Sequence, residues 1–199
     1  MCPQLSHAGL FHSIYGTEGF QGFSLSFSHR PAIAALIGER SETLAFTFCV
    51  IDRYSVDLSL SSPTRTLYSR PELGRFPITL TEDLWYDFLE LTLADWLEQV
   101  ESAATRENAL FRWKVGEAYA YRRDAYKLMA TILKERSERL QVAFEMLEKV
   151  METEGVGTRE LVQPRTPPMS EAAEKVYEVR RVVEGGEEVP ETWAPVRRT

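Results

Sequence analysis

The side chains best suited to chemistry in this sequence are the tyrosines and arginines crowded into residues 117 to 127. Arginine binds a carboxylate or phosphate through a planar fork of donors, and tyrosine adds flat contact area at small entropic cost. This composition is typical of anion recognition and of the dominant residues of protein interfaces. The predicted partner- or anion-binding residues are Tyr119, Tyr121, Arg122, Arg123, Tyr126 and Lys127, with Trp193 as a separate candidate.

Two of these arginines have a structural alternative. Arg122 falls in the apolar stripe of its segment, so it could instead pair inside the fold with an acid such as Asp87, Glu90 or Asp95. Breaking a buried pair costs several kcal/mol, so an arginine kept for stability is a credible alternative. Arg123 lies on the neighbouring face, and for it the sequence leaves both roles open.

The segment from 76 to 105 contains no lysine or arginine and is rich in acids. Carboxylates on adjacent helical turns, such as Asp83, Asp87, Glu90 and Glu98, can converge on a metal. Helical di-metal sites, however, combine such acids with a Glu-x-x-His pattern, and no histidine follows His29. We therefore predict a solvated acidic face, with no metal and no cofactor.

Conventional catalytic groups are sparse. His7 and His12 lack the spacing that places two ligands on one helix face, and His29 falls at the end of an alternating run. Cys49 has no recognisable motif around it. The glycines of residues 16–22 follow no strand and lead into no helix, so they do not match a phosphate-binding loop. We predict no catalytic residue, and the sequence leaves enzymatic activity open.

Bulk properties narrow the class of protein. The chain has 199 residues and a net charge of −7, and no run of basic residues is long enough to bind nucleic acid. Its two cysteines favour a reducing, cytoplasmic location. No signal peptide is evident, and no stretch approaches the ~20 apolar residues of a membrane span.

Alternating hydrophobicity predicts strands in the first third of the chain. Apolar and polar residues alternate over 23–29 and again over 44–60, which is the period of a half-buried strand. The shared parity favours a three-residue loop or a bulge at Asp52. These segments predict a small antiparallel sheet over about 22–62. Residues 1–22 and the proline-rich stretch after residue 62 are expected to be irregular.

Helical periodicity dominates the middle of the chain. The first helix is expected over about 81–104, starting at a capping Thr81 followed by two acids. The second is expected over about 108–153, and the two should pair antiparallel. A helix of that length exceeds what the small sheet can cover. Its distal apolar residues should therefore seek a second subunit; they are Leu140, Phe144, Leu147 and Met151.

The C-terminal part, 155–199, is expected to hold a proline-rich linker, a short helix and a flexible tail. The tail contains Trp193 among polar residues. It is interpreted either as a docking peptide whose tryptophan enters a pocket on a partner or second copy, or as a disordered end.

Together these patterns predict an α+β fold, with residues 1–154 forming one domain of a small N-terminal sheet packed on a long helical hairpin. The function that we predict is a non-catalytic, homo-oligomeric protein-binding adaptor, assembly or regulatory factor, using the Arg/Tyr-rich helix. The alternative is a small-anion-binding domain or enzyme with a pocket between sheet and hairpin. Arg122→Ala tests the anion-binding alternative. That alternative requires the variant to lose ligand binding with little loss of stability, whereas an arginine in a structural pair predicts the reverse.

Overall fold

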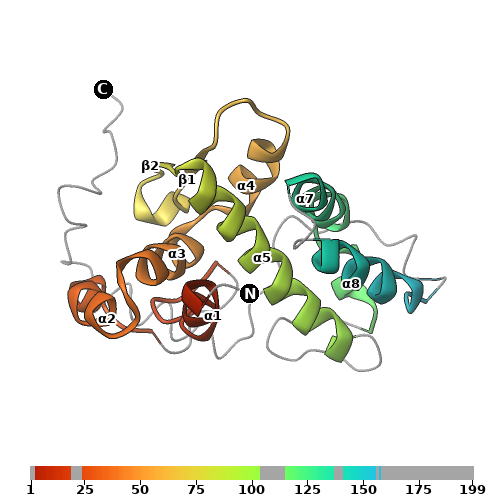
Figure 1. Ribbon diagram of the computed structural model, residues 1–199, viewed down its shortest axis with the longest axis horizontal. Coiled ribbons are helices and arrows are strands. Elements are labelled where there is room, and N and C mark those ends of the chain that lie inside the picture. Colours follow the sequence, from red (N-terminus) through yellow and green to blue (C-terminus); the bar gives the residue numbers. More distant parts are fainter. Residues whose placement is uncertain (1–2, 19–23, 104–114, 137–140, 156, 158–199) are drawn as a thin grey trace. The chain divides into compact units, whose positions relative to one another are not determined.

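The computed structural model describes residues 3–18, 24–103, 115–136, 141–155 and 157 (Figure 1). Within these ranges lie eight α-helices and a two-stranded antiparallel sheet, so the α+β class is confirmed. The chain divides into two units between Glu82 and Asp83. Among the described residues, those up to Glu82 belong to unit 1 and those from Asp83 onward belong to unit 2. The single domain expected over 1–154 stays a prediction.

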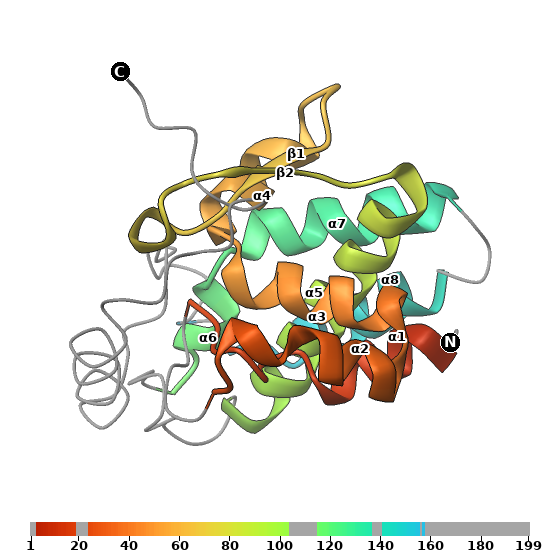
Figure 2. The same cartoon turned by 90° about the vertical axis from the view of Figure 1, so that its left-hand side faces the viewer.

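Unit 1 is built around one buried helix. The first four helices are α1 (Pro3–Leu10), α2 (Arg30–Ile37), α3 (Glu39–Val50) and α4 (Arg53–Leu60). Helix α3 packs against both α1 and α2, and the three lie side by side in Figure 2. Every residue from Leu44 to Val50 is buried. The helix at 3–10 also shows that the irregular start expected over 1–22 is wrong.

The strand predicted over residues 44–50 is wrong, and the burial of α3 gives the reason. Alternation distinguishes a strand from a helix only when one face meets water. Here neighbours cover α3 all round, so polar and apolar residues are buried alike, including Thr47 and Glu42. A buried helix and a buried strand of this length share the same hydrophobic signal.

The strand predicted over 53–60 is also wrong, because the buried face of α4 contains serines. Its buried residues include Ser55, Val56, Ser59 and Leu60, which follow helical spacing. The Ser55 and Ser59 hydroxyls donate to the carbonyls of Asp52 and Val56, both at 2.7 Å. These hydrogen bonds allow polar side chains to be buried on the helix.

The first predicted strand is wrong as well over its described part. Residues 27–29 form a 3₁₀ turn that leads directly into α2, and Ser26 caps it by accepting from the Ser28 amide at 3.2 Å. Pro31 occupies the first turn of α2, where a missing N–H costs nothing. Residues 19–23 lie outside the described chain.

The sheet instead forms in the proline-rich stretch expected to be irregular. Strands β1 (Thr66–Tyr68) and β2 (Pro77–Thr79) are antiparallel, with Leu67 opposite Ile78. Proline is compatible with the first residue of such an edge strand. Gly74, at φ 94°, closes the turn between the strands in a conformation that favours glycine.

Unit 2 begins with the remainder of α5 (Glu82–Ala103), whose bounds confirm the first predicted helix. The single helix expected over 108–153 is wrong. The described residues form α6 (Glu117–Ala120), α7 (Arg123–Arg136) and α8 (Gln141–Glu152). Arg122 separates α6 from α7 with a left-handed φ of 50°, which no α-helix can accommodate.

Helix α8 folds back on α7 (Figure 1). The Tyr119 and Thr153 hydroxyls lie 2.9 Å apart, and Arg123 forms an ion pair with Glu154. These contacts join the end of α8 to the start of α7, so the two helices are antiparallel. Leu147 is buried in this arrangement. Leu147 was expected to seek a second subunit because a helix over 108–153 would extend beyond the sheet. Since α8 packs on α7 instead, that reason no longer applies to Leu147.

Candidate functional site

The Arg/Tyr segment is an interior cluster of unit 2. Arg122 is only 1 % exposed, and its guanidinium carbon lies 5.1 Å from the Tyr126 ring and 5.9 Å from the Tyr121 ring. Its Nη1 donates to the Tyr126 hydroxyl at 3.4 Å. Tyr126 stacks on Trp96 from α5, with ring centroids 4.5 Å apart.

The structure places four of the candidate residues in the interior of unit 2, and their binding role stays a prediction. Tyr119, Tyr121, Arg122 and Tyr126 are each no more than 3 % exposed. Water does not reach them in this structure, and the rings of Tyr121 and Tyr126 hold the Arg122 cation within the fold. The cluster therefore acts as a packing centre.

The remaining candidates differ from one another. Arg123 forms its ion pair with the buried Glu154, which supports the structural role that the sequence left open. Lys127 is exposed on α7. Trp193 lies outside the described residues, as does the predicted linker and short helix.

One acid of the acidic helix contacts helix α7. Asp83, at the start of α5, accepts from Arg136 at 3.3 Å, and the Arg136 guanidinium lies 4.7 Å from the Tyr86 ring. Together with the Trp96–Tyr126 stack, these contacts make α5 and α7 antiparallel. In the part of the chain that the structure describes, no three histidine, cysteine or acidic residues gather where they could hold a metal.

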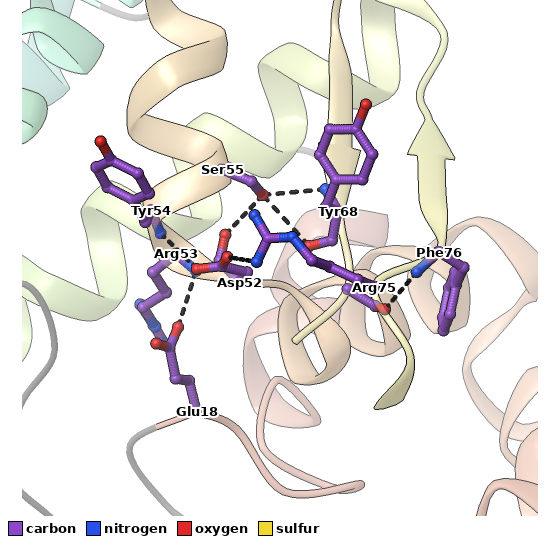
Figure 3. Close-up of polar contacts among 9 residues, drawn as sticks. Glu18, Asp52, Arg53, Tyr54, Ser55, Tyr68, Arg75 and Phe76 are labelled. Atoms are coloured by element: carbon purple, nitrogen blue, oxygen red, sulfur yellow. Dashed lines mark hydrogen bonds and ion pairs between the residues drawn. The ribbon is translucent and has the colours of Figure 1, made fainter. Parts of the chain in front are cut away.

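A polar cluster that the sequence analysis missed caps the N-terminus of α4 (Figure 3). Asp52 accepts from the Tyr54 amide at 3.0 Å and pairs with Arg75 at 2.7 Å. Glu18 accepts from the Arg53 amide at 2.8 Å. Two carboxylates thus occupy the positive end of one helix, where free N–H groups and the helix dipole favour them.

Ser55 fastens this cap to the sheet. Its hydroxyl accepts from the Tyr68 amide at 3.0 Å, within reach of the Tyr68 carbonyl at 3.2 Å (Figure 3). The Asp52 amide donates to the same carbonyl at 2.9 Å. The cap and strand β1 consequently form one hydrogen-bonded body, which is what a structural role requires.

Burial raises the pKa of Glu18 above its ordinary value near 4.5. The Arg53 amide and guanidinium oppose this effect, whereas the neighbouring Asp52 charge adds to it. The chemistry available to Glu18 is therefore proton exchange.

A pH dependence of stability follows from Glu18. Because its pKa is higher in the folded than in the unfolded state, the folded state binds the proton more tightly. This contribution is complete below the unfolded pKa and is lost as the pH rises through the folded pKa. As the pH rises through this range, the free energy of unfolding of Glu18→Gln should increase relative to that of the natural protein. Urea unfolding from pH 4 to 8 measures the difference.

Glu18→Met provides the matched control. It removes the charge and also the acceptor of the Arg53 amide, which should cost about 1–3 kcal/mol at every pH. Its pH profile should run parallel to that of Glu18→Gln. If the natural protein shows that same profile, the raised pKa of Glu18 is contradicted.

A second buried cluster in unit 1 surrounds Glu42. Arg30 donates to both carboxylate oxygens, at 2.5 and 2.6 Å, and the Tyr15 hydroxyl donates at 3.0 Å. Burial, followed by the negative charge of Glu42, raises the pKa of Tyr15. The Arg30 guanidinium also lies 3.7 Å from the Phe46 ring centre. Every charge in this cluster has an internal partner.

Cys49 and His12 are packed together beside it. The Cys49 thiol is fully buried, donates to the His12 carbonyl at 3.1 Å, and has a pKa raised by burial to about 12. A thiol held in this protonated form is a poor nucleophile. The His12 ring meets Phe48 edge-on and lies 2.6 Å from the Gly9 carbonyl, whereas His29 is exposed.

A surface hollow of about 720 Å³ lies on the α7–α8 hairpin. At the hollow, the Lys134 ammonium lies 4.0 Å from the centre of the Phe144 ring. Its lining residues are Thr131, Lys134, Glu135, Gln141 and Phe144. This mixture of one aromatic face with exposed polar groups suits contact with a protein side chain better than the enclosure of a small molecule.

A family model described as a domain of unknown function (DUF6817) matches residues 1–53, which include the Glu42 cluster and reach the cap of α4. No curated protein and no solved structure matches the chain. Among the described helices, none is both long and apolar enough to cross a membrane.

Proposed function

We propose that this chain is a non-catalytic protein-binding adaptor or assembly factor, and that helix α8 carries its contact surface. The observation that supports the proposal most directly is the apolar arc of α8, which is wider than its partner α7 covers. Val142 and Met146 are 57 % and 51 % exposed although they lie on a helix that buries Leu147.

The helical period separates two faces of α8. Phe144 and Leu147 are three residues apart and face α7, as the contact between Phe144 and Lys134 indicates. Val142 and Met146 are four residues apart and lie on another face. An apolar pair at this spacing is the pattern by which one helix docks against another helix or a groove.

The non-catalytic part of the proposal is supported by the carboxylates and the thiol of unit 1, which are already engaged in contacts within the fold. Glu42, Asp52 and Glu18 each bind an internal donor, and the Cys49 thiol is buried and protonated. The small-anion-binding alternative has less support, since Glu42 already pairs with Arg30 and Glu72 with the buried Arg70.

The partner that we propose is a second copy of the chain, in the cytoplasm. Glu145 and Lys149 border the exposed pair on α8. In a two-fold antiparallel pairing of α8 with its copy, Glu145 of one chain faces Lys149 of the other when the axis passes near residue 147. The same surface thus offers apolar burial together with complementary charge.

A double substitution tests this surface. Val142→Glu with Met146→Glu introduces two like charges into the contact. The Kd of the dimer should therefore rise at least 100-fold. Light scattering during size-exclusion chromatography, over a range of protein concentrations, measures the change. Thermal unfolding at low concentration shows whether the variant remains folded.

Glu148→Lys is the matched control, because it changes charge on α8 at an exposed residue outside the apolar pair. It should leave self-association within a few-fold of the natural protein. A natural protein that is monomeric at 100 micromolar or about that concentration contradicts the second copy as partner. If a different protein is then captured through Val142 and Met146, the adaptor function stands but its partner is that protein and not a second copy of the chain.

A further inference from the structure

The loop between α4 and β1 contains an exposed serine-proline sequence that the packing of unit 1 does not require. It reads Ser61-Ser62-Pro63-Thr64-Arg65, and its first four residues are exposed. A serine followed by proline, with a basic residue three positions after the serine, is the spacing that proline-directed protein kinases recognise. We propose that Ser62 is a phosphorylation site, independently of the adaptor function.

The Ser62 hydroxyl is accessible at low cost. It accepts from the Thr64 amide at 3.2 Å and lies 3.0 Å from the Thr64 hydroxyl, and both contacts are exposed to water. Pro63 has no N–H to leave unsatisfied when the loop straightens. The loop is anchored by Leu60 and Leu67, which are buried, so a kinase needs to open only the residues between them.

The reaction is a simple group transfer. The Ser62 Oγ attacks the γ-phosphorus of a nucleoside triphosphate, forming an O–P bond while the bond between the β-γ bridging oxygen and the γ-phosphorus breaks. The nucleoside diphosphate leaves with that electron pair, and the hydroxyl proton passes to the base of the kinase. No oxidant or reductant takes part.

The new charge changes one contact at the start of α5. Arg65 Nη2 lies 3.6 Å from the Glu82 carboxylate, and both side chains are more than a third exposed. Such an exposed pair is weak. A phosphoserine carries about two negative charges and accepts strongly from arginine, so it takes Arg65 away from Glu82. Modification of Ser62 therefore breaks the contact between Arg65 and Glu82.

Phosphorylation of the purified full-length chain tests the site. The probe is a proline-directed serine/threonine kinase with magnesium and ATP, and mass spectrometry assigns the modified residue. Thr166, which also precedes a proline, is replaced by alanine throughout. We expect Ser62 to be modified, with Pro63→Ala slowing this at least 10-fold. Ser61→Ala is the matched control and should change the rate less than 2-fold.

The contact with Arg65 has its own readout. The second pKa of a free phosphoserine is about 6. Phosphorus NMR should find it lower at Ser62 and restored in the fully phosphorylated Arg65→Gln variant. An unmodified Ser62, or a rate unaffected by Pro63→Ala, overturns the site. Identical titrations in the two phosphorylated proteins overturn the contact with Arg65.

Discussion

Replacing Glu42 by alanine is expected to lower the free energy of unfolding by about 3–5 kcal/mol. The side chain is 4 % exposed and receives two hydrogen bonds from Arg30 and one from Tyr15. Its removal leaves a partly buried guanidinium without its carboxylate and a buried phenol without its acceptor. Denaturant unfolding followed by circular dichroism measures the loss.

Two further variants separate the contributions at Glu42. Tyr15→Phe removes a single hydrogen bond and should cost about 1 kcal/mol. Glu39→Ala, at the exposed start of the same helix, removes a favourable contact with the helix dipole and should cost less than about 1 kcal/mol. Equal losses for Glu42→Ala and Glu39→Ala would contradict a buried charge cluster at the centre of unit 1.

The helix that the sequence predicted best is α5, for reasons visible in its residues. Glu82 and Asp83 follow a threonine at its start, and its apolar residues recur on one side because the other side meets water. Trp85, Leu89 and Trp96, which follow helical spacing, are buried. Amphipathic periodicity is informative where a helix has one wet face.

Helices α3 and α4 could not be predicted in this way. Neighbouring elements bury α3 on all sides, and the serines of α4 are buried through hydrogen bonds to carbonyls of their own turn. The even-numbered apolar residues of α4 divide accordingly. Val56 and Leu60 are buried, whereas Tyr54 and Leu58 are exposed, a division that only a helix produces.

The polar clusters show a similar limit. Asp52 was recognisable as a helix cap, because an aspartate before a helical segment is a common N-terminal signal. Its position inside an alternating pattern favoured a turn instead. Glu18 lies 35 residues from Arg53, whose amide it binds. No local rule connects two residues at that separation, so this contact requires the fold.

Arg122 presents the most demanding test of unit 2, since the sequence offered both a functional and a structural role for it. Its guanidinium lies against Tyr121 and Tyr126 and is 1 % exposed. We expect Arg122→Ala to lower the free energy of unfolding by about 3 kcal/mol, through the cavity and the lost contacts with both rings. Lys127→Ala, on the exposed side of α7, should change it by less than about 0.5 kcal/mol.

The backbone at Arg122 adds a sharper prediction. A φ of 50° costs an L-residue with a side chain about 1–2 kcal/mol, a cost from which glycine is exempt. Arg122→Gly should therefore be more stable than Arg122→Ala by about 1 kcal/mol, the reverse of the order expected inside a helix. Urea unfolding of the two variants measures the difference. If alanine proves the more stable, residues 117–136 form a continuous helix, and the separation of α6 from α7 at this residue is wrong.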